Sequence, residues 1–105
     1  MKKSTRVATV GEIPLGKGIK IKLGNEYIAI FNHNGHFHAI QNRCPHQNAD
    51  LADGYIRNNQ VYCPLHNWAF DIKTGAFAFN PGQRINTYPV EIHNNDIFII
   101  YDSHL

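Results

Sequence analysis

Two short stretches of the sequence each place a cysteine and a histidine close together. Cys44 and His46 are separated by one residue in "NRCPHQNADLADG", and Cys63 and His66 by two residues in "VYCPLHNWAFD". The chain contains no other cysteine. Thiolate sulfur and imidazole nitrogen are protein ligands of zinc and of some iron–sulfur clusters. These four residues are therefore candidate metal ligands.

A proline follows each cysteine directly, as Pro45 and Pro64. Proline fixes φ near about −65° and donates no N–H, so it makes a rigid turn. Such a turn holds a thiolate and the nearby imidazole in one orientation. It also leaves the following backbone N–H groups free to point at an anion. The shared cysteine–proline start argues against two unrelated loops that pair a cysteine with a histidine by chance.

Length and composition limit the classes of protein to which the chain can belong. Its 105 residues suit one domain, and its formal net charge is +2 with neutral histidines. The basic residues do not gather into one face, which argues against nucleic-acid binding. We find no apolar run long enough to span a membrane and no secretory apolar segment after the charged N-terminus. We therefore expect a cytoplasmic protein with no nucleic-acid or membrane partner, in which cysteines rarely form disulfides.

Three kinds of site compete for the two cysteine–histidine pairs. A disulfide between Cys44 and Cys63 suits a cytoplasmic protein poorly and leaves the histidines unexplained. A zinc site accepts two thiolates and two imidazoles, but the usual zinc finger groups like ligands together and continues into a helix. A [2Fe–2S] cluster with two cysteines on one iron and two histidines on the other fits two loops that each supply one of each.

The rest of the chain reads as short strands separated by turns. Apolar and polar residues alternate with period two in 18–23, and Gly24-Asn25 and Asn34-Gly35 are hairpin turns. The expected strands are 6–10, 18–23, 26–32, 36–42, three short runs between 54 and 72, and two runs within 85–102. The only helical signal is about one turn near residues 47–52. The class is all-β, with strands spaced as in a sandwich or small barrel and a turn-rich middle segment inserted between them.

Other side chains that could act in catalysis, metal binding or electron transfer have simpler interpretations. Three carboxylates, Asp50, Asp53 and Asp71, lie beside turn residues, where aspartate is common, so an acid–base role is disfavoured. His36 and His38 have a metal-like spacing on one strand, but no third ligand is evident. Trp68 follows the second pair closely, and packing of its loop explains it better than a role as an electron relay.

Both stretches resemble the ligand boxes of Rieske [2Fe–2S] domains. "CPHQNADLADG" is similar to the first box with its Leu-x-x-Gly turn, and "CPLHNWAFDIKTG" to the second with its Trp, Phe-Asp and Thr-Gly. The resemblance covers nearly the whole chain. Residues 63–92 most resemble the small subunit of assimilatory NAD(P)H-dependent nitrite reductases. The small Rieske ferredoxins of ring-hydroxylating dioxygenases are the alternative.

The resemblance implies a fold and a role for each ligand. It implies a single Rieske domain over residues 1–105, with an antiparallel β-sandwich base at about 1–41 and 83–105. The cluster-binding subdomain would be inserted at about 42–82. Cys44 and Cys63 would bind one iron, and His46 and His66 the other. Respiratory Rieske proteins carry an extra cysteine in each box, and this chain has none, which implies looser loops and a lower reduction potential.

The function implied by the resemblance is one-electron transfer. In a nitrite reductase, the chain would serve a large subunit that holds flavin and sirohaem and reduces nitrite to ammonia during nitrate assimilation. It would then have no complete catalytic site of its own. In the alternative, it would deliver electrons to a dioxygenase. The expected partner is thus a large reductase subunit or another redox protein.

Overall fold

The computed structural model describes residues 2–45, 48–65 and 67–102. These residues form strands and two short 3₁₀ helices, which confirms the all-β class and its antiparallel sheets. The elements, in chain order, are β1 (Lys2–Thr9), η1 (Val10–Glu12), β2 (Gly18–Leu23), β3 (Glu26–His33), β4 (His36–Gln41), η2 (Leu51–Asp53), β5 (Tyr55–Arg57), β6 (Gln60–Tyr62), β7 (Ala69–Asp71), β8 (Ala76–Phe77), β9 (Asn80–Arg84), β10 (Thr87–Tyr88), β11 (Val90–His93) and β12 (Asp96–Asp102).

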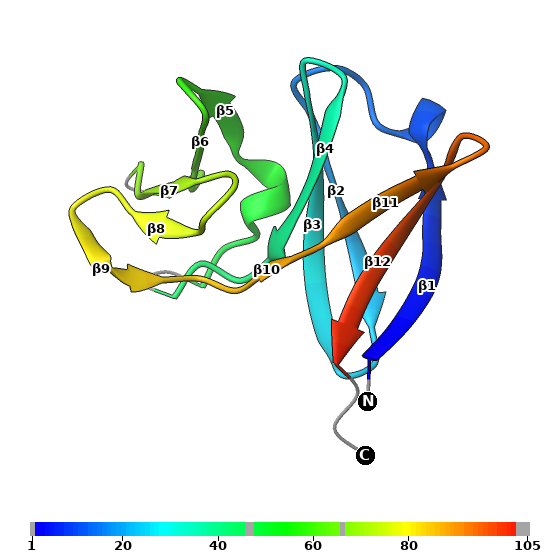
Figure 1. The fold of residues 1–105 in the computed structure, drawn as a ribbon. Coiled ribbons are helices and arrows are strands. Elements are labelled where there is room, and N and C mark those ends of the chain that lie inside the picture. The colour runs from blue at the N-terminus through cyan, green and yellow to red at the C-terminus, as the bar shows by residue number, and fades with distance from the viewer. Residues whose placement is uncertain (1, 46–47, 66, 103–105) are drawn as a thin grey trace.

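Two sheets pack face to face to form a base. One has the strand order β1-β12-β11 and the other β10-β4-β3-β2, all antiparallel neighbours. Figure 1 shows these strands together at one side of the molecule, with the smaller β5–β9 sheet at the other. The core of the base is apolar, and its buried members are Ala8, Ile13, Leu23, Ile28, Ile30, Ala39, Ile97 and Ile99.

Strand β3 separates this core from a second one. Its central residues are all buried, and alternate side chains point to opposite faces of a strand. Ile28 and Ile30 therefore pack in the base, whereas Ala29 and Phe31 pack in the second core. The second core also contains both cysteines and residues of the smaller sheet. Because the two cores share a strand, the smaller sheet is fixed against the base.

The smaller sheet has five strands, but they are short, and their order is β5-β6-β7-β8-β9. It runs to Arg84, because β9 pairs with β8. Gly75 lets the chain turn tightly before β8: its φ is +77°, and a Cβ there would lie 2.3 Å from the carbonyl oxygen of Ile85. A side chain at this position is therefore excluded by both backbone conformation and space.

Asparagine occupies many of the turn positions that have a positive φ. Asn34, Asn58, Asn59, Asn94 and Asn95 all have positive φ, which asparagine adopts more readily than most residues. Strand β2 has the expected bounds, but the expected helical turn near 47–52 lies slightly later, at η2. No helix among the described residues is long and apolar enough to cross a membrane.

Candidate metal centre

The two cysteine loops close with the same backbone hydrogen bond. The Cys44 N–H donates to the carbonyl of Ala49 over 3.1 Å, and the Cys63 N–H to that of Trp68 over 2.7 Å. Each loop therefore spans five residues beyond its cysteine. Pro45 and Pro64 are both exposed, while the cysteines before them are buried. The chain thus turns outward directly after each sulfur and returns to the same place.

The cysteines are free and lie next to each other in the second core. They are at most 1% exposed, although they come from different loops. Burial raises the pKa of the Cys63 thiol to about 11, a hydrogen bond from the Leu65 backbone opposes this, and the neighbouring Cys44 thiol adds to the increase. At neutral pH this thiol keeps its proton, so an incoming metal must displace it.

The buried amide of Asn42 holds the neck of the first loop, by which we mean the place where the chain enters and leaves the loop. Asn42 is 2% exposed, and its backbone N–H donates to the Tyr27 carbonyl while its own carbonyl accepts from Leu51. Its side-chain Oδ1 accepts from the Ala52 N–H over 3.1 Å, and its Nδ2 donates to Asp50 Oδ1 over 2.9 Å. The backbone and side chain of one residue thus bind both the base and the returning chain.

An ion pair joins the same neck to the edge of the base. The Lys20 ammonium on β2 donates to Asp50 Oδ2 over 3.0 Å, with both side chains partly exposed. This hydrogen bond lowers the pKa of Asp50, and the Asn42 amide acts in the same direction. The carboxylate of Asp50 therefore has one oxygen on the base and the other on the neck.

Aromatic rings hold the second loop. The Trp68 ring lies 5.1 Å from the Phe77 ring and edge-on to Phe79 at 5.8 Å. Phe77 in turn stacks on Phe70 at 5.3 Å. Because the carbonyl of Trp68 closes the loop onto Cys63, this packing sets the position of the loop through its last residue.

Asn67 bends the second loop just before Trp68. Its φ is +54°, a left-handed conformation that asparagine tolerates, and its Oδ1 accepts a hydrogen bond from the Tyr55 hydroxyl over 3.3 Å. The Tyr55 ring stacks on Tyr62, the residue before Cys63, with centroids 5.0 Å apart. The two ends of the second loop are therefore tied to each other through Tyr55.

Other candidate side chains form contacts that have structural explanations. Asp71 accepts hydrogen bonds from the Lys73 and Thr74 N–H groups, which is a turn-stabilising role. His38 lies 6.5 Å from His33, whose Nε2 hydrogen-bonds Asn59 Oδ1. No group of three histidine, cysteine, aspartate or glutamate side chains in the described ranges is arranged to hold a metal ion.

The structure places the two predicted sulfur ligands together, and it does not describe the two nitrogen ligands. His46 and His66 lie outside the described residues, in the loops that begin at Cys44 and Cys63. Two supporting residues carried no signal that singled them out in the sequence. Asn42 reads as the end of a strand, and Phe79 as one more apolar residue in a short run.

Comparison with known proteins now identifies the family. The model of the Rieske [2Fe-2S] domain matches residues 3–89. The chain belongs to the Rieske [2Fe-2S] domain family. This Rieske chain is 40% identical over 92 residues to the 3-phenylpropionate/cinnamic acid dioxygenase ferredoxin subunit of Escherichia coli (strain K12), and the match covers 86% of each protein.

Solved structures agree on the fold. The Sphingomonas yanoikuyae B1 ferredoxin superposes with a TM-score of 0.85 at 32% identity, covering 95% of the Rieske chain and all of that chain. A candidate NADH-dependent nitrite reductase small subunit from Mycobacterium tuberculosis superposes with a TM-score of 0.89 at 20% identity, covering 99% of each. At that identity, the second likeness bears on the fold alone.

The cysteine site suits the cofactor of this family, a Rieske [2Fe–2S] cluster. The cluster requires two thiolates on one iron, and the structure brings two free, buried cysteines together from loops with matching closures. Both cysteines are free in the structure, as ligands of the cluster must be. The donor set, two sulfurs with one histidine in each loop, fits the Rieske type.

Proposed function

We propose that the chain is a Rieske ferredoxin that delivers single electrons to the oxygenase component of a ring-hydroxylating dioxygenase. The observation that carries this proposal is its 40% identity, over most of both chains, to a dioxygenase ferredoxin subunit. The second support is the 32% identity to a ferredoxin of the same fold, whose whole length is covered. A related ferredoxin has been solved in complex with the oxygenase of carbazole 1,9a-dioxygenase.

In this proposal, four residues hold the cluster. Cys44 and Cys63 bind one iron as thiolates, and His46 and His66 bind the other through imidazole nitrogen. The cluster accepts and releases one electron, and its neutral imidazole ligands raise its potential above that of four-thiolate clusters. The buried cysteines and the closed loops keep water from the sulfur side and hold the ligands in place.

The small subunit of an NAD(P)H-dependent nitrite reductase is the second candidate. It is supported by the resemblance of residues 63–92 to that subunit. The structural match to a candidate member of that group is close, but at 20% identity it reflects the shared fold. The ferredoxin function has the stronger support because its relatives match at the level of sequence.

Two measurements, made one after the other, test the proposal. The chain is reconstituted anaerobically with iron and sulfide, reduced, and examined by EPR. A Rieske-type spectrum supports the ligand assignment, whereas stoichiometric zinc binding without that spectrum contradicts electron transfer. The loaded chain is then added to the remaining components of the E. coli 3-phenylpropionate/cinnamic acid dioxygenase. Product formation supports the ferredoxin role; co-purification with a large subunit that reduces nitrite to ammonia supports the second candidate instead.

A further inference from the structure

Phe79 is the most exposed large apolar side chain among the described residues. It lies in the turn between β8 and β9 and is 74% exposed. Its ring meets Trp68 and Phe77 edge-on, at centroid distances of 5.8 and 5.5 Å. These edge contacts leave most of the ring in water, so packing within the chain does not explain a phenylalanine here.

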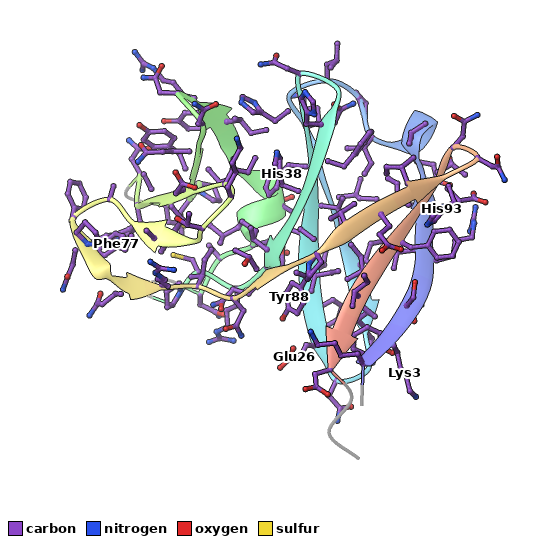
Figure 2. All side chains as sticks on the ribbon, viewed as in Figure 1. Lys3, Glu26, His38, Phe77, Tyr88 and His93 are labelled. Atoms are coloured by element: carbon purple, nitrogen blue, oxygen red, sulfur yellow. The ribbon has the colours of Figure 1, made fainter. Side chains whose placement is uncertain are left out.

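Other exposed apolar residues lie in the second cysteine loop, which contacts Phe79 through Trp68. Leu65, which lies inside the second cysteine loop, is 46% exposed, and Pro64 beside it is exposed as well. Trp68 links this loop to Phe79. Figure 1 shows the β8–β9 hairpin at the end of the molecule farthest from the base, and Figure 2 labels Phe77 within it. We call Pro64, Leu65 and Phe79 the apolar tip.

The strand next to the apolar tip cannot readily be extended by a partner strand. β9 is one of the two edge strands of its sheet, and all five of its residues are exposed. Pro81 within it donates no N–H, and proline is a common means of blocking edge-to-edge pairing. A partner at this end must therefore be recognised through side chains.

Two exposed arginines lie on the side of the first cysteine loop. Arg84 and Pro45 line one cavity of about 240 Å³ beside the first cysteine loop, and Arg43 precedes that loop. Both arginines are exposed, and neither forms an ion pair with another described residue. The segments 54–70 and 72–90 contain no aspartate or glutamate. A complementary surface would be apolar at its centre and acidic at its rim, the arrangement typical of specific interfaces with aromatic and arginine anchors.

We propose that Phe79 and Leu65 anchor the chain in an apolar pocket of the electron-accepting oxygenase, and that carboxylates at the rim of that pocket pair with Arg43 and Arg84. This inference rests on the proposed function and adds the determinants of docking. Burying the apolar tip places the second cysteine loop against the partner. The arginines orient the approach and make association salt-dependent.

The experiment uses cluster-loaded chains and the remaining components of the E. coli 3-phenylpropionate/cinnamic acid dioxygenase. The rate of product formation is measured against the concentration of each chain. Phe79→Ser is expected to raise the half-saturating concentration about tenfold or more, as for an interface hot spot, with an unchanged maximal rate. Ile92→Ser is the matched control, because Ile92 is 45% exposed on β11 of the base. It is expected to behave as the wild type.

The charge component is tested in the same assay. Arg84→Glu is expected to raise the half-saturating concentration and to flatten its dependence on salt, whereas Lys17→Glu on the base leaves both unchanged. The EPR spectrum and the reduction potential of every variant are expected to match those of the wild type, which separates docking from damage to the cluster. Equal half-saturation for Phe79→Ser and Ile92→Ser overturns the docking inference alone. A loaded wild-type chain that supports no turnover contradicts the proposed function and, with it, docking on an oxygenase.

Discussion

The loop after Cys44 is held at its neck by a buried amide and an ion pair, whereas the loop after Cys63 is held by stacked aromatic rings. Both loops close with the same hydrogen bond from the cysteine N–H. The first loop depends on directed contacts to the base. The second depends on apolar area within the smaller sheet.

This difference shows how one centre can be fixed from two sides. Hydrogen bonds fix orientation but leave an expensive unpaired group when one partner is lost. Aromatic packing tolerates small shifts but loses much stability when a ring is removed. The two cysteines therefore share a core while their loops respond to different perturbations.

The largest effect is expected from replacing either cysteine, and it should be the same for both loops. Cys44→Ser and Cys63→Ser are each expected to abolish the cluster, because the two thiolates are proposed to bind the same iron. Iron and acid-labile sulfide per chain, together with EPR of the reduced protein, measure the outcome. A variant that retains a full Rieske spectrum would show that its loop does not supply a ligand. Pro64→Ala, which keeps both sulfurs, is the control and is expected to retain the cluster.

Removal of the central aromatic ring tests the second loop. Phe77 is 4% exposed and contacts Phe70, Trp68 and Phe79. Phe77→Ala is expected to lower the free energy of unfolding by about 3–5 kcal/mol, from lost burial and the cavity left behind. Phe77→Leu should lose less. Denaturant unfolding of the loaded chain at low and high salt provides the measurement, and the loss should be the same at both. A strong salt dependence would contradict an apolar support.

Loss of the buried amide tests the first loop. Asn42→Ala leaves the Ala52 N–H without its side-chain acceptor and removes the donor to Asp50. The expected decrease in the free energy of unfolding is about 1–3 kcal/mol, the desolvation penalty of an unpaired buried group. Hydrogen exchange read by mass spectrometry should accelerate in peptides covering 48–54 more than in those covering 67–72.

The isosteric variant Asn42→Asp sharpens that result. It keeps an acceptor for Ala52 but places a second carboxylate beside Asp50, so it should be destabilised more as the pH rises and both groups ionise. If Asn42→Ala instead accelerates exchange equally in both loops, the supports of the two loops are not independent.

The sequence was sufficient for the framework of this centre. The period-two pattern of β2 and the asparagine-rich turns are local signals, and the structure places strands and turns there. The proximity of Cys44 and Cys63 followed from two matching loops that suit one metal centre. These signals depend on residue type and short spacing, which the sequence states directly.

The supports of the loops could not be predicted, because they depend on contacts distant in the chain. Lys20 and Asp50 are 30 residues apart, and nothing local marks either as a partner of the other. The run Ala76-Phe77-Ala78-Phe79 suggests two phenylalanines on one face of a strand. The strand ends at Phe77, so one ring is buried and the other is exposed.

The smallest expected effect concerns a cleft between β4 of the base and the chain that follows β7. His38 lies on β4, the strand that leads into the first loop, and it lines a cleft of about 470 Å³ with Lys73, which follows β7 beyond the second loop. Figure 2 shows His38 between the base and the smaller sheet. Burial lowers the pKa of His38, and His33, Lys73 and His36 act in the same direction while Asp71 opposes them.

A lowered histidine pKa means that the unfolded chain binds this proton more tightly than the folded chain. The stability due to neutral His38 is therefore complete above the ordinary pKa of 6.5 and decreases as the pH falls from there toward the lowered folded value. His38→Gln should reduce the decrease in the free energy of unfolding between pH 7.5 and about 5.5. This change should be smaller than the losses expected for Phe77→Ala and Asn42→Ala. His93→Gln, an exposed histidine on β11, is the control. An unchanged slope in His38→Gln would mean that burial of His38 in this cleft does not contribute to the dependence of stability on pH.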